Sequence, residues 1–159
     1  MRSNSLAALA AISILSILSA CGGGSSSTGS SGSSTTISGS VVKGNVSGAT
    51  VIIKNAATGA AIATTTTDSS GAYSVSVSFN GDVVVEATGG TYTDEATGRA
   101  TNLSTPLRVA LTASGSTVTG MVTPLTSMAY TYAFGNSTTA VTTAAYNTMA
   151  TSVASQFKL

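Results

Sequence analysis

Few side chains in this sequence can carry out acid–base, nucleophilic or metal chemistry. The 159 residues include no histidine, one cysteine and five carboxylates. Without histidine the chain lacks the Ser-His-Asp and Cys-His arrangements and the commonest metal ligand. One cysteine supplies neither a structural zinc site nor a disulfide within the chain. The sequence therefore predicts a protein that is not an enzyme, with no catalytic residues, no metal site and no cofactor.

The carboxylates that come closest to a functional pattern have simpler structural interpretations. Asp94 and Glu95 are adjacent, and neighbours in a strand point to opposite faces, so we expect a solvated edge rather than an acid–base pair. Asp68 opens the segment Asp68-Ser69-Ser70-Gly71, which lacks the further carboxylates of a calcium loop. We expect its side chain to close a tight turn.

The single cysteine lies directly after an apolar segment. Arg2 precedes an uncharged, largely apolar run over residues 6–18, which as a helix would rise about 20 Å, short of the ~30 Å hydrocarbon layer. This pattern is typical of a secretory signal, the alternative being an uncleaved N-terminal anchor. The residues before and at the cysteine are Leu18, Ser19, Ala20 and Cys21.

This tetrapeptide resembles the lipobox of bacterial lipoproteins. The resemblance implies a signal peptide over residues 1–20, cleavage between Ala20 and Cys21, and a diacylglycerol on the Cys21 sulfur. One acyl chain such as palmitate holds a protein only marginally, whereas the three chains expected of such lipoproteins hold it permanently. Gly22, rather than Asp, follows the cysteine. By the sorting rules of such proteins, this favours the outer membrane of a Gram-negative bacterium.

A tether and a β-rich body follow. Residues 22–36 consist of Gly, Ser and Thr, so with Cys21 we expect a disordered tether over 21–36. From Ile37 the hydrophobic pattern has period two, with expected strands at 38–44, 49–54, 61–67, 72–79, 82–87, 91–95 and 103–111. Asn80-Gly81 predicts a hairpin between two of these strands. Short strands separated by frequent turns predict an antiparallel β-sandwich over 37–122.

Two motifs resemble the carboxypeptidase regulatory-like family of transthyretin-like sandwiches. The first is the strand entry containing Gly48, Ala49 and Val51; the second is the later turn and strand with Thr67, Asp68, Gly71 and Tyr73. The match covers about residues 37–95. It implies an accessory, non-catalytic module in an exported protein.

Residues 123–159 change to a helical pattern. Thr123 is suited to cap a helix with Pro124 in its first turn. Leu125, Met128, Ala129 and Tyr132 would form its apolar stripe, ended by Gly135. A second helix would begin near Thr139 and present Tyr146, Met149, Val153 and Phe157. Because an apolar Phe157 precedes the last two residues without a C-cap glycine, we also expect that the sequence is a piece of a longer protein.

Two sharper hypotheses concern the folded body. Some sandwiches on bacterial surfaces carry a Lys–Asn isopeptide bond promoted by a carboxylate, and Lys43 or Lys54, Asn102 and Glu86 are the residue types required. The aromatic residues Tyr92, Tyr130, Tyr132 and Phe134 are candidates for a glycan-stacking surface, although core packing is the favoured interpretation.

These observations define the expected function. After removal of residues 1–20, five cationic and five acidic side chains remain, so no basic patch supports nucleic-acid binding. We expect a lipid-anchored cell-envelope protein with a non-catalytic interaction or structural module. Its partners would be membrane lipid, through Cys21, and an unknown protein or glycan. The alternative is an accessory regulatory or carbohydrate-binding domain of a larger or partnered exported hydrolase.

Overall fold

The structure, a computed structural model, describes residues 34–158. In chain order the elements are β1 Thr35–Val41, β2 Thr50–Asn55, β3 Ala61–Thr66, β4 Ala72–Val77, β5 Gly81–Thr88, β6 Thr91–Thr93, β7 Ala100–Asn102, β8 Leu107–Ala113, β9 Thr117–Val122, α1 Pro124–Phe134 and α2 Thr143–Phe157. The expected signal peptide, Cys21 and most of the expected tether lie outside the described residues.

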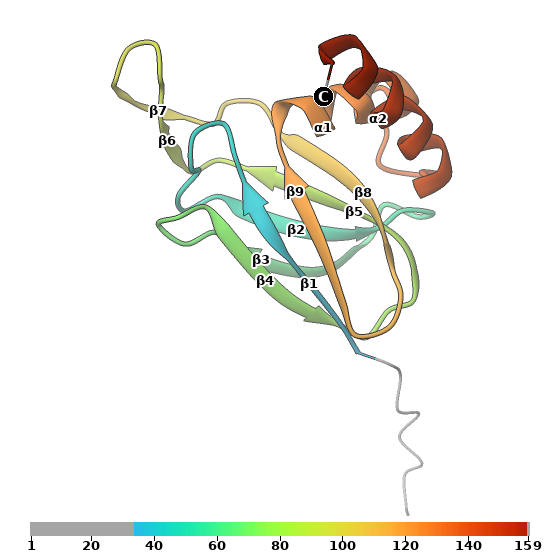
Figure 1. Cartoon of the computed structure of the whole chain (residues 1–159). Helices are drawn as coiled ribbons and strands as arrows, with labels where there is room; N and C mark the ends of the chain where they lie inside the picture. Colours follow the sequence, from blue (N-terminus) through green and yellow to red (C-terminus); the bar gives the residue numbers. More distant parts are fainter. Residues whose placement is uncertain (1–33, 159) are drawn as a thin grey trace, which may run out of the picture. The chain divides into compact units, whose positions relative to one another are not determined.

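Two sheets face each other across the core, with the helices beside β8 (Figure 1). One sheet has the strand order β4-β1-β9 and the other β3-β2-β5-β8, while β6 and β7 form a separate two-stranded hairpin. Every pairing is antiparallel except that of β1 with β9, which is parallel. The predicted class, a mainly β sandwich followed by short C-terminal helices, is confirmed.

The alternation of side chains fills the space between the two sheets. On the four-stranded sheet, Val51, Ile53, Val83 and Val85 share one face through the β2–β5 register and are fully buried. The opposite sheet contributes Ile37, which is fully buried. Burying such side chains stabilises the fold by about 1.5–3 kcal/mol each.

The three-stranded sheet needs two glycines to accommodate a tyrosine. Gly39 in β1 pairs with both Tyr73 in β4 and Gly120 in β9. The buried Tyr73 hydroxyl donates a hydrogen bond to the Gly120 carbonyl over 2.7 Å. A Cβ on Gly39 would lie 1.8 Å from that same carbonyl oxygen, so only glycine fits there.

The hairpin predicted at Asn80-Gly81 is wrong. β4 belongs to the three-stranded sheet and β5 to the four-stranded sheet, so this segment crosses between sheets. Asn80 is not among the non-glycine residues with positive φ, which a type I′ turn requires. The physical reason is burial: Val83, Val84 and Val85 are all fully buried. A strand covered on both faces needs a central place between β2 and β8.

The expected tether also ends earlier than predicted, because β1 begins at Thr35 rather than after Thr36. Thr35 is almost fully buried, and its hydroxyl donates to the Gly115 carbonyl over 2.9 Å. A polar residue can therefore begin a buried strand when its hydrogen bond is satisfied.

The first helix starts as the sequence predicts. The Thr123 hydroxyl accepts a hydrogen bond from the Thr126 N–H, the Thr123 N–H donates to the Thr126 hydroxyl, and Pro124 opens the helix. The helix ends at Phe134 with Gly135 as its C-cap, as expected. Its buried face is partly mispredicted, because Tyr130 is fully buried whereas Tyr132 is 63% exposed. The predicted stripe chose the wrong tyrosine because Tyr130, and not Tyr132, lies on the side of α1 that packs against Arg108 of β8.

The second helix starts later than predicted, at Thr143 rather than near Thr139, with Thr142 as its N-cap. Tyr146 and Val153 are buried, as expected, while Phe157 is 51% exposed. Neither of these two helices is long and apolar enough to cross a membrane.

Candidate functional site

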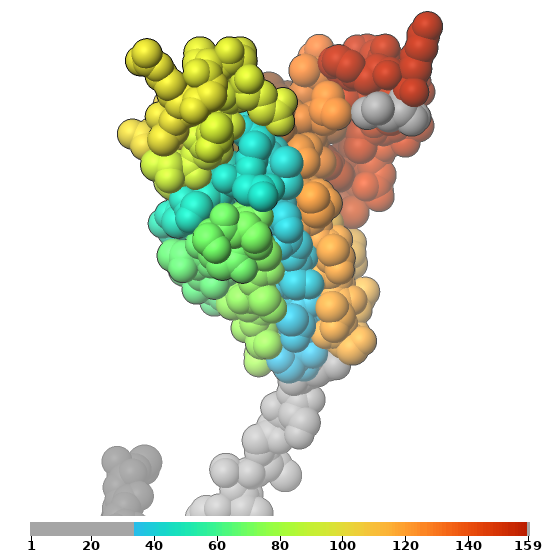
Figure 2. Space-filling view, turned by 60° about the vertical axis from the view of Figure 1, so that its left-hand side comes forward, coloured from blue at the N-terminus to red at the C-terminus, as the bar shows by residue number. Residues whose placement is uncertain are grey.

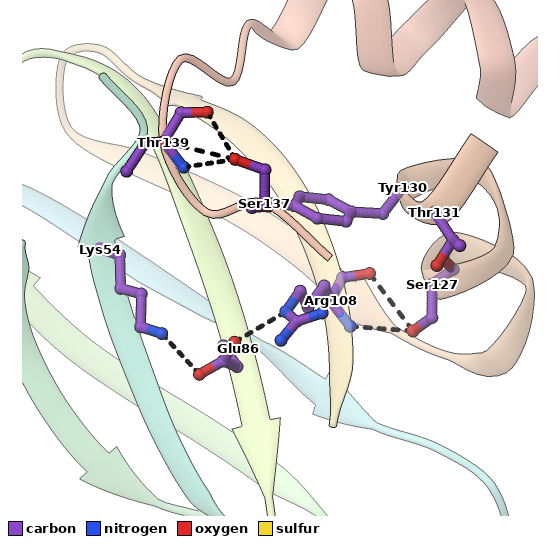
Figure 3. Close-up of polar contacts among 8 residues, drawn as sticks. All are labelled: Lys54, Glu86, Arg108, Ser127, Tyr130, Thr131, Ser137 and Thr139. Atoms are coloured by element: carbon purple, nitrogen blue, oxygen red, sulfur yellow. Dashed lines mark hydrogen bonds and ion pairs between the residues drawn. The ribbon is translucent and has the colours of Figure 1, made fainter. Parts of the chain in front are cut away.

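A buried carboxylate organises the face of the four-stranded sheet that lies toward the helices. Glu86 lies on the inner strand β5, where it pairs with Arg108 on β8 and with Ile52 on β2. Lys54 follows Ile52 by two residues on β2, so its side chain lies on the same face of the sheet. Lys54 Nζ donates to Glu86 Oε1 over 2.6 Å, and Arg108 Nε donates to Glu86 Oε2 over 2.7 Å (Figure 3). The carboxylate therefore joins three neighbouring strands.

The protonation state of Glu86 follows from these contacts. Burial raises the pKa of the Glu86 carboxyl, but the hydrogen bonds and charges of Lys54 and Arg108 outweigh burial. The net result is a pKa below the ordinary glutamate value. Glu86 is thus ionised at neutral pH and shares one negative charge between two cations.

Arg108 is held from several sides. Its guanidinium lies 5.8 Å from the centre of the Tyr130 ring, within the range of a cation–π contact. Its backbone N–H donates to the Ser127 hydroxyl over 2.8 Å, which ties β8 to α1 (Figure 3). Burial raises the pKa of the Tyr130 phenol to about 12, and its hydroxyl donates to the Ser137 carbonyl over 2.7 Å. The guanidinium is therefore positioned by Tyr130 of α1 as well as by Glu86 of β5.

Next to Arg108 the surface opens into a groove of about 580 Å³ between α1 and the start of β8. Figure 2 shows the molecule hollowed between the β6–β7 hairpin, in yellow, and α1, in orange. The apolar part of the lining comprises Leu103, Pro106, Leu107, Pro124 and Met128. The cationic part comprises Lys43 and Arg108, and the exposed Tyr132 also lines the groove. We call this the α1–β8 groove.

The remaining aspartates serve the fold. Asp68 Oδ1 accepts hydrogen bonds from the Ser70 hydroxyl, the Ser70 N–H and the Ala72 N–H, and these lower the pKa of Asp68. Asp82 accepts from the Thr112 hydroxyl and from the Thr143 N–H at the start of α2. Asp94 accepts from the N–H and hydroxyl of Thr97, which lower the pKa of Asp94. Asp68 thus closes a turn, in keeping with its structural interpretation.

The two family-like motifs meet in space. The Ala49 N–H donates to the Thr67 hydroxyl over 2.9 Å, and that hydroxyl donates to the Val46 carbonyl over 2.6 Å. Gly48 has a φ of 69° and its N–H reaches the Thr67 carbonyl. Thr67 therefore fastens the entry of β2 to the end of β3.

The other motif residues lie in the same region of the sandwich. Val51 is fully buried in the core. Gly71, with a φ of 81°, accepts a hydrogen bond from the Val41 N–H at its carbonyl. A Cβ there would lie 2.8 Å from the Val41 carbonyl oxygen. Together with Tyr73, these residues support strands rather than line the α1–β8 groove.

The proposed aromatic surface is not formed. Tyr92 is buried beneath the Lys43 ammonium, which lies 5.2 Å from the ring centre. Tyr130 is buried, and Phe134 packs edge-on against it with 5.3 Å between the ring centres. Of the four candidates, Tyr132 is exposed and Phe134 is half-buried, whereas core packing, the favoured interpretation, holds for Tyr92 and Tyr130.

The structure does not bring Lys54, Asn102 and Glu86 together as the isopeptide hypothesis requires. Lys54 and Glu86 do come together, but Asn102 lies exposed in β7, where it pairs with Thr91. Arg108 fills the second position beside the carboxylate. Lys54 is thus placed for an ion pair with Glu86. Within residues 34–158, no cluster of three or more metal-ligating side chains occurs.

Sequence reasoning missed Arg108 and the α1–β8 groove. Arg108 lies 22 residues from Glu86, and only the β5–β8 register makes them neighbours. The one sequence signal was an arginine between apolar residues in a strand otherwise suited to burial.

Comparisons with known proteins give limited similarity. No family model matches the chain. No curated protein matches it either. Among solved structures, BcpA, the major pilin subunit of Bacillus cereus, matches with 23% identity, a TM-score of 0.39 and 57% of this chain covered. A variant of the same subunit matches with 24% identity and a TM-score of 0.37 over 55% of this chain. The chain spans 29% of the length of that pilin subunit.

Proposed function

We propose that this chain is a lipid-anchored cell-envelope protein whose β-sandwich is a non-catalytic binding module. The observation that carries the binding role is the α1–β8 groove, an open apolar surface with the fixed cation Arg108 at its side. The lipobox resemblance of Leu18, Ser19, Ala20 and Cys21 supports the anchor. Gly22 after the cysteine supports the outer membrane of a Gram-negative bacterium.

The engagement of the carboxylates supports a role without catalysis. A general acid or base must be free to exchange a proton with a substrate near neutral pH. The hydrogen bonds of Asp68, Asp82 and Asp94 close turns or join elements, and Glu86 bridges two cations. The pKa values of all four carboxyls lie below the ordinary values. Such groups remain ionised and bound to the fold.

The anchor is tested in cells that produce the full chain and a Cys21→Ser variant. We expect the wild type to fractionate with membranes and to incorporate an alkyne analogue of palmitate, and the variant to do neither. Protease added to intact cells then distinguishes surface display from a periplasmic orientation. Equal fractionation of both forms would overturn the anchor.

The alternative role, an accessory domain of a larger or partnered exported hydrolase, has its own test. The gene is sequenced beyond the codon for Leu159. A reading frame that continues for several hundred residues into a hydrolase domain would favour this alternative over a self-contained binding module.

A further inference from the structure

We propose that the α1–β8 groove binds an apolar peptide segment that carries a carboxylate, and that Arg108 anchors that carboxylate. This inference rests on the proposed binding role and adds the chemical class of the ligand. The carboxylate belongs to an Asp or Glu side chain or to a free C-terminus, and both present the same planar pair of oxygens. The argument starts from how Arg108 is held.

Arg108 presents a preorganised cation. Glu86 accepts from its Nε, Tyr130 lies under the guanidinium, and the side chain is only 16% exposed. Among the hydrogen bonds of residues 34–158, the guanidinium uses Nε alone. Within residues 34–158 its terminal nitrogens have no hydrogen-bond partner and are not among the fully buried unpaired atoms, and Arg108 lines the groove. A planar guanidinium whose two terminal nitrogens lack partners suits bidentate binding of a carboxylate.

The charge of the site favours an anion. Glu86 supplies one negative charge against the two positive charges of Lys54 and Arg108, so the cluster keeps a net positive charge. Lys43 adds a second cation to the groove, and no carboxylate contributes to the lining formed by the described residues. A ligand carboxylate in the groove would supply a second negative charge and so neutralise the positive charge that Glu86 alone does not balance.

The rest of the groove favours a peptide over a sugar or a nucleic acid. Its walls include Leu103, Leu107 and Met128, which suit apolar side chains. Thr105, Thr131 and Asn136 supply polar groups suited to a peptide backbone. Only one aromatic ring, that of Tyr132, lines the groove in the described chain, which gives little stacking surface for glycans or bases. The groove is therefore matched to an apolar segment that ends in or contains an acid.

The test uses three hexapeptide libraries with Leu, Val, Pro or Ala at the variable positions. The first contains one Glu and an amidated C-terminus, the second has Gln in place of Glu, and the third has Gln and a free C-terminal carboxylate. Binding to the full chain carrying Cys21→Ser in detergent micelles is measured by fluorescence anisotropy. We expect at least about tenfold tighter binding of an acid-bearing library than of the all-amide library.

Variants assign the preference to the groove. Arg108→Gln should reduce the acid-to-amide ratio to less than about twofold, and Lys43→Gln should lower it by a smaller factor. Arg108→Lys, which keeps the charge but not the planar fork, should also weaken acid binding. Arg99→Gln removes the same charge from the loop before β7, outside the groove lining, and should change nothing. If Arg108→Gln fails to fold, Arg108→Lys and Lys43→Gln decide.

Several results would overturn the proposal. The first is equal binding of acid and amide peptides, or no peptide binding at all. The second is a preference for acid peptides that persists in both Arg108 variants. The third is binding of a uronic-acid oligosaccharide or a free fatty acid in place of the peptides. If membrane attachment still depends on Cys21, any of these results would contradict only the proposed ligand class and not the proposal of a lipid-anchored protein. Comparing the first and third libraries tells a side-chain carboxylate from a C-terminal one.

Discussion

The outward faces of the two sheets differ in chemistry, although side chains alternate between inward and outward positions in both sheets. The outward positions of the three-stranded sheet carry hydroxyls in paired rows: Thr36, Ser38, Ser40, Ser74, Ser76, Thr117 and Thr119. They are half-buried or exposed and uncharged. The corresponding face of the four-stranded sheet carries Asp82, Glu86 and Arg108 and meets the two helices.

The difference teaches where specificity can be built. Hydroxyls on a bare face exchange hydrogen bonds with water at little cost, so their positions need no partner. Charges on a covered face must be paired, and pairing fixes their geometry. Only the covered face therefore holds a cation in one orientation beside a groove, and we place the function there.

The largest loss of stability that we predict comes from disrupting the pairing within the three-stranded sheet, not from removing the hydroxyls on its outward face. Gly39→Ala places a Cβ 1.8 Å from the Gly120 carbonyl oxygen, which must separate β1 from β9. We expect a loss of about 3 kcal/mol in the free energy of unfolding, at the upper end of the usual cost of overpacking, measured by urea denaturation. Ser38→Ala, on the outward side of the same strand, is the matched control and should stay within about 0.5 kcal/mol. A Gly39→Ala protein as stable as the control would contradict the packing described.

The second-largest loss of stability that we predict comes from breaking the ion pairs on the face of the four-stranded sheet that the helices cover. Among the described residues, Glu86 is the only carboxylate paired with Lys54 and Arg108, whose side chains are 18% and 16% exposed, and Glu86→Gln removes its charge. We expect a loss of roughly 3 kcal/mol in unfolding free energy, since two largely buried cations lose their partner. Glu95→Gln removes an exposed carboxylate and should change stability little. Similar losses in both variants would show that Glu86 has no special role.

Acid titration sharpens the same comparison. Because the pKa of Glu86 is lowered in the folded state, its stabilisation is present above the ordinary glutamate pKa and is lost as the pH falls through the folded value. Stability measured from pH 7 to pH 3 should therefore fall below about pH 4.5. The fall should be smaller in Glu86→Gln, with Asp68, Asp82 and Asp94 accounting for the remainder. Parallel curves for the two proteins would argue against the ion pairs.

The smallest loss of stability that we predict concerns helix α1, which covers the four-stranded sheet. Thr123→Ala removes the hydroxyl that accepts the Thr126 N–H at the start of α1. We expect a loss of about 1 kcal/mol, measured by thermal unfolding. Thr148→Ala changes the same residue type inside α2, where its hydroxyl bonds the Ala144 carbonyl, and should be neutral or slightly stabilising. A larger loss at Thr148 than at Thr123 would contradict the capping role.

Local features of this fold were predictable from sequence, and long-range partners were not. The alternation at Tyr73, Val75 and Val77 and the cap at Thr123 are written in neighbouring residues, and the structure shows both. The destination of β5 depended on burial of both its faces, which overrode the turn signal of Asn80-Gly81.

The candidate site shows the same limit. Glu86 and Lys54 were recognised as residue types that can react together, but they lie 32 residues apart and their register was unknown. Arg108 became visible only through the β5–β8 pairing. On α1 the helical period alone did not distinguish Tyr130 from Tyr132, because the choice depends on which side of the helix meets β8.

The most direct test of the account maps binding onto the two faces. Amide NMR spectra of the full chain carrying Cys21→Ser in micelles are recorded as the tightest Glu-containing peptide of the first library is added. We predict shifts concentrated at the α1–β8 groove, including Leu107, Arg108, Ser127 and Thr131, and none for the matching Gln peptide. Shifts concentrated on the hydroxyl rows at Ser38, Ser74 and Thr119 would place binding on the bare face and contradict the account.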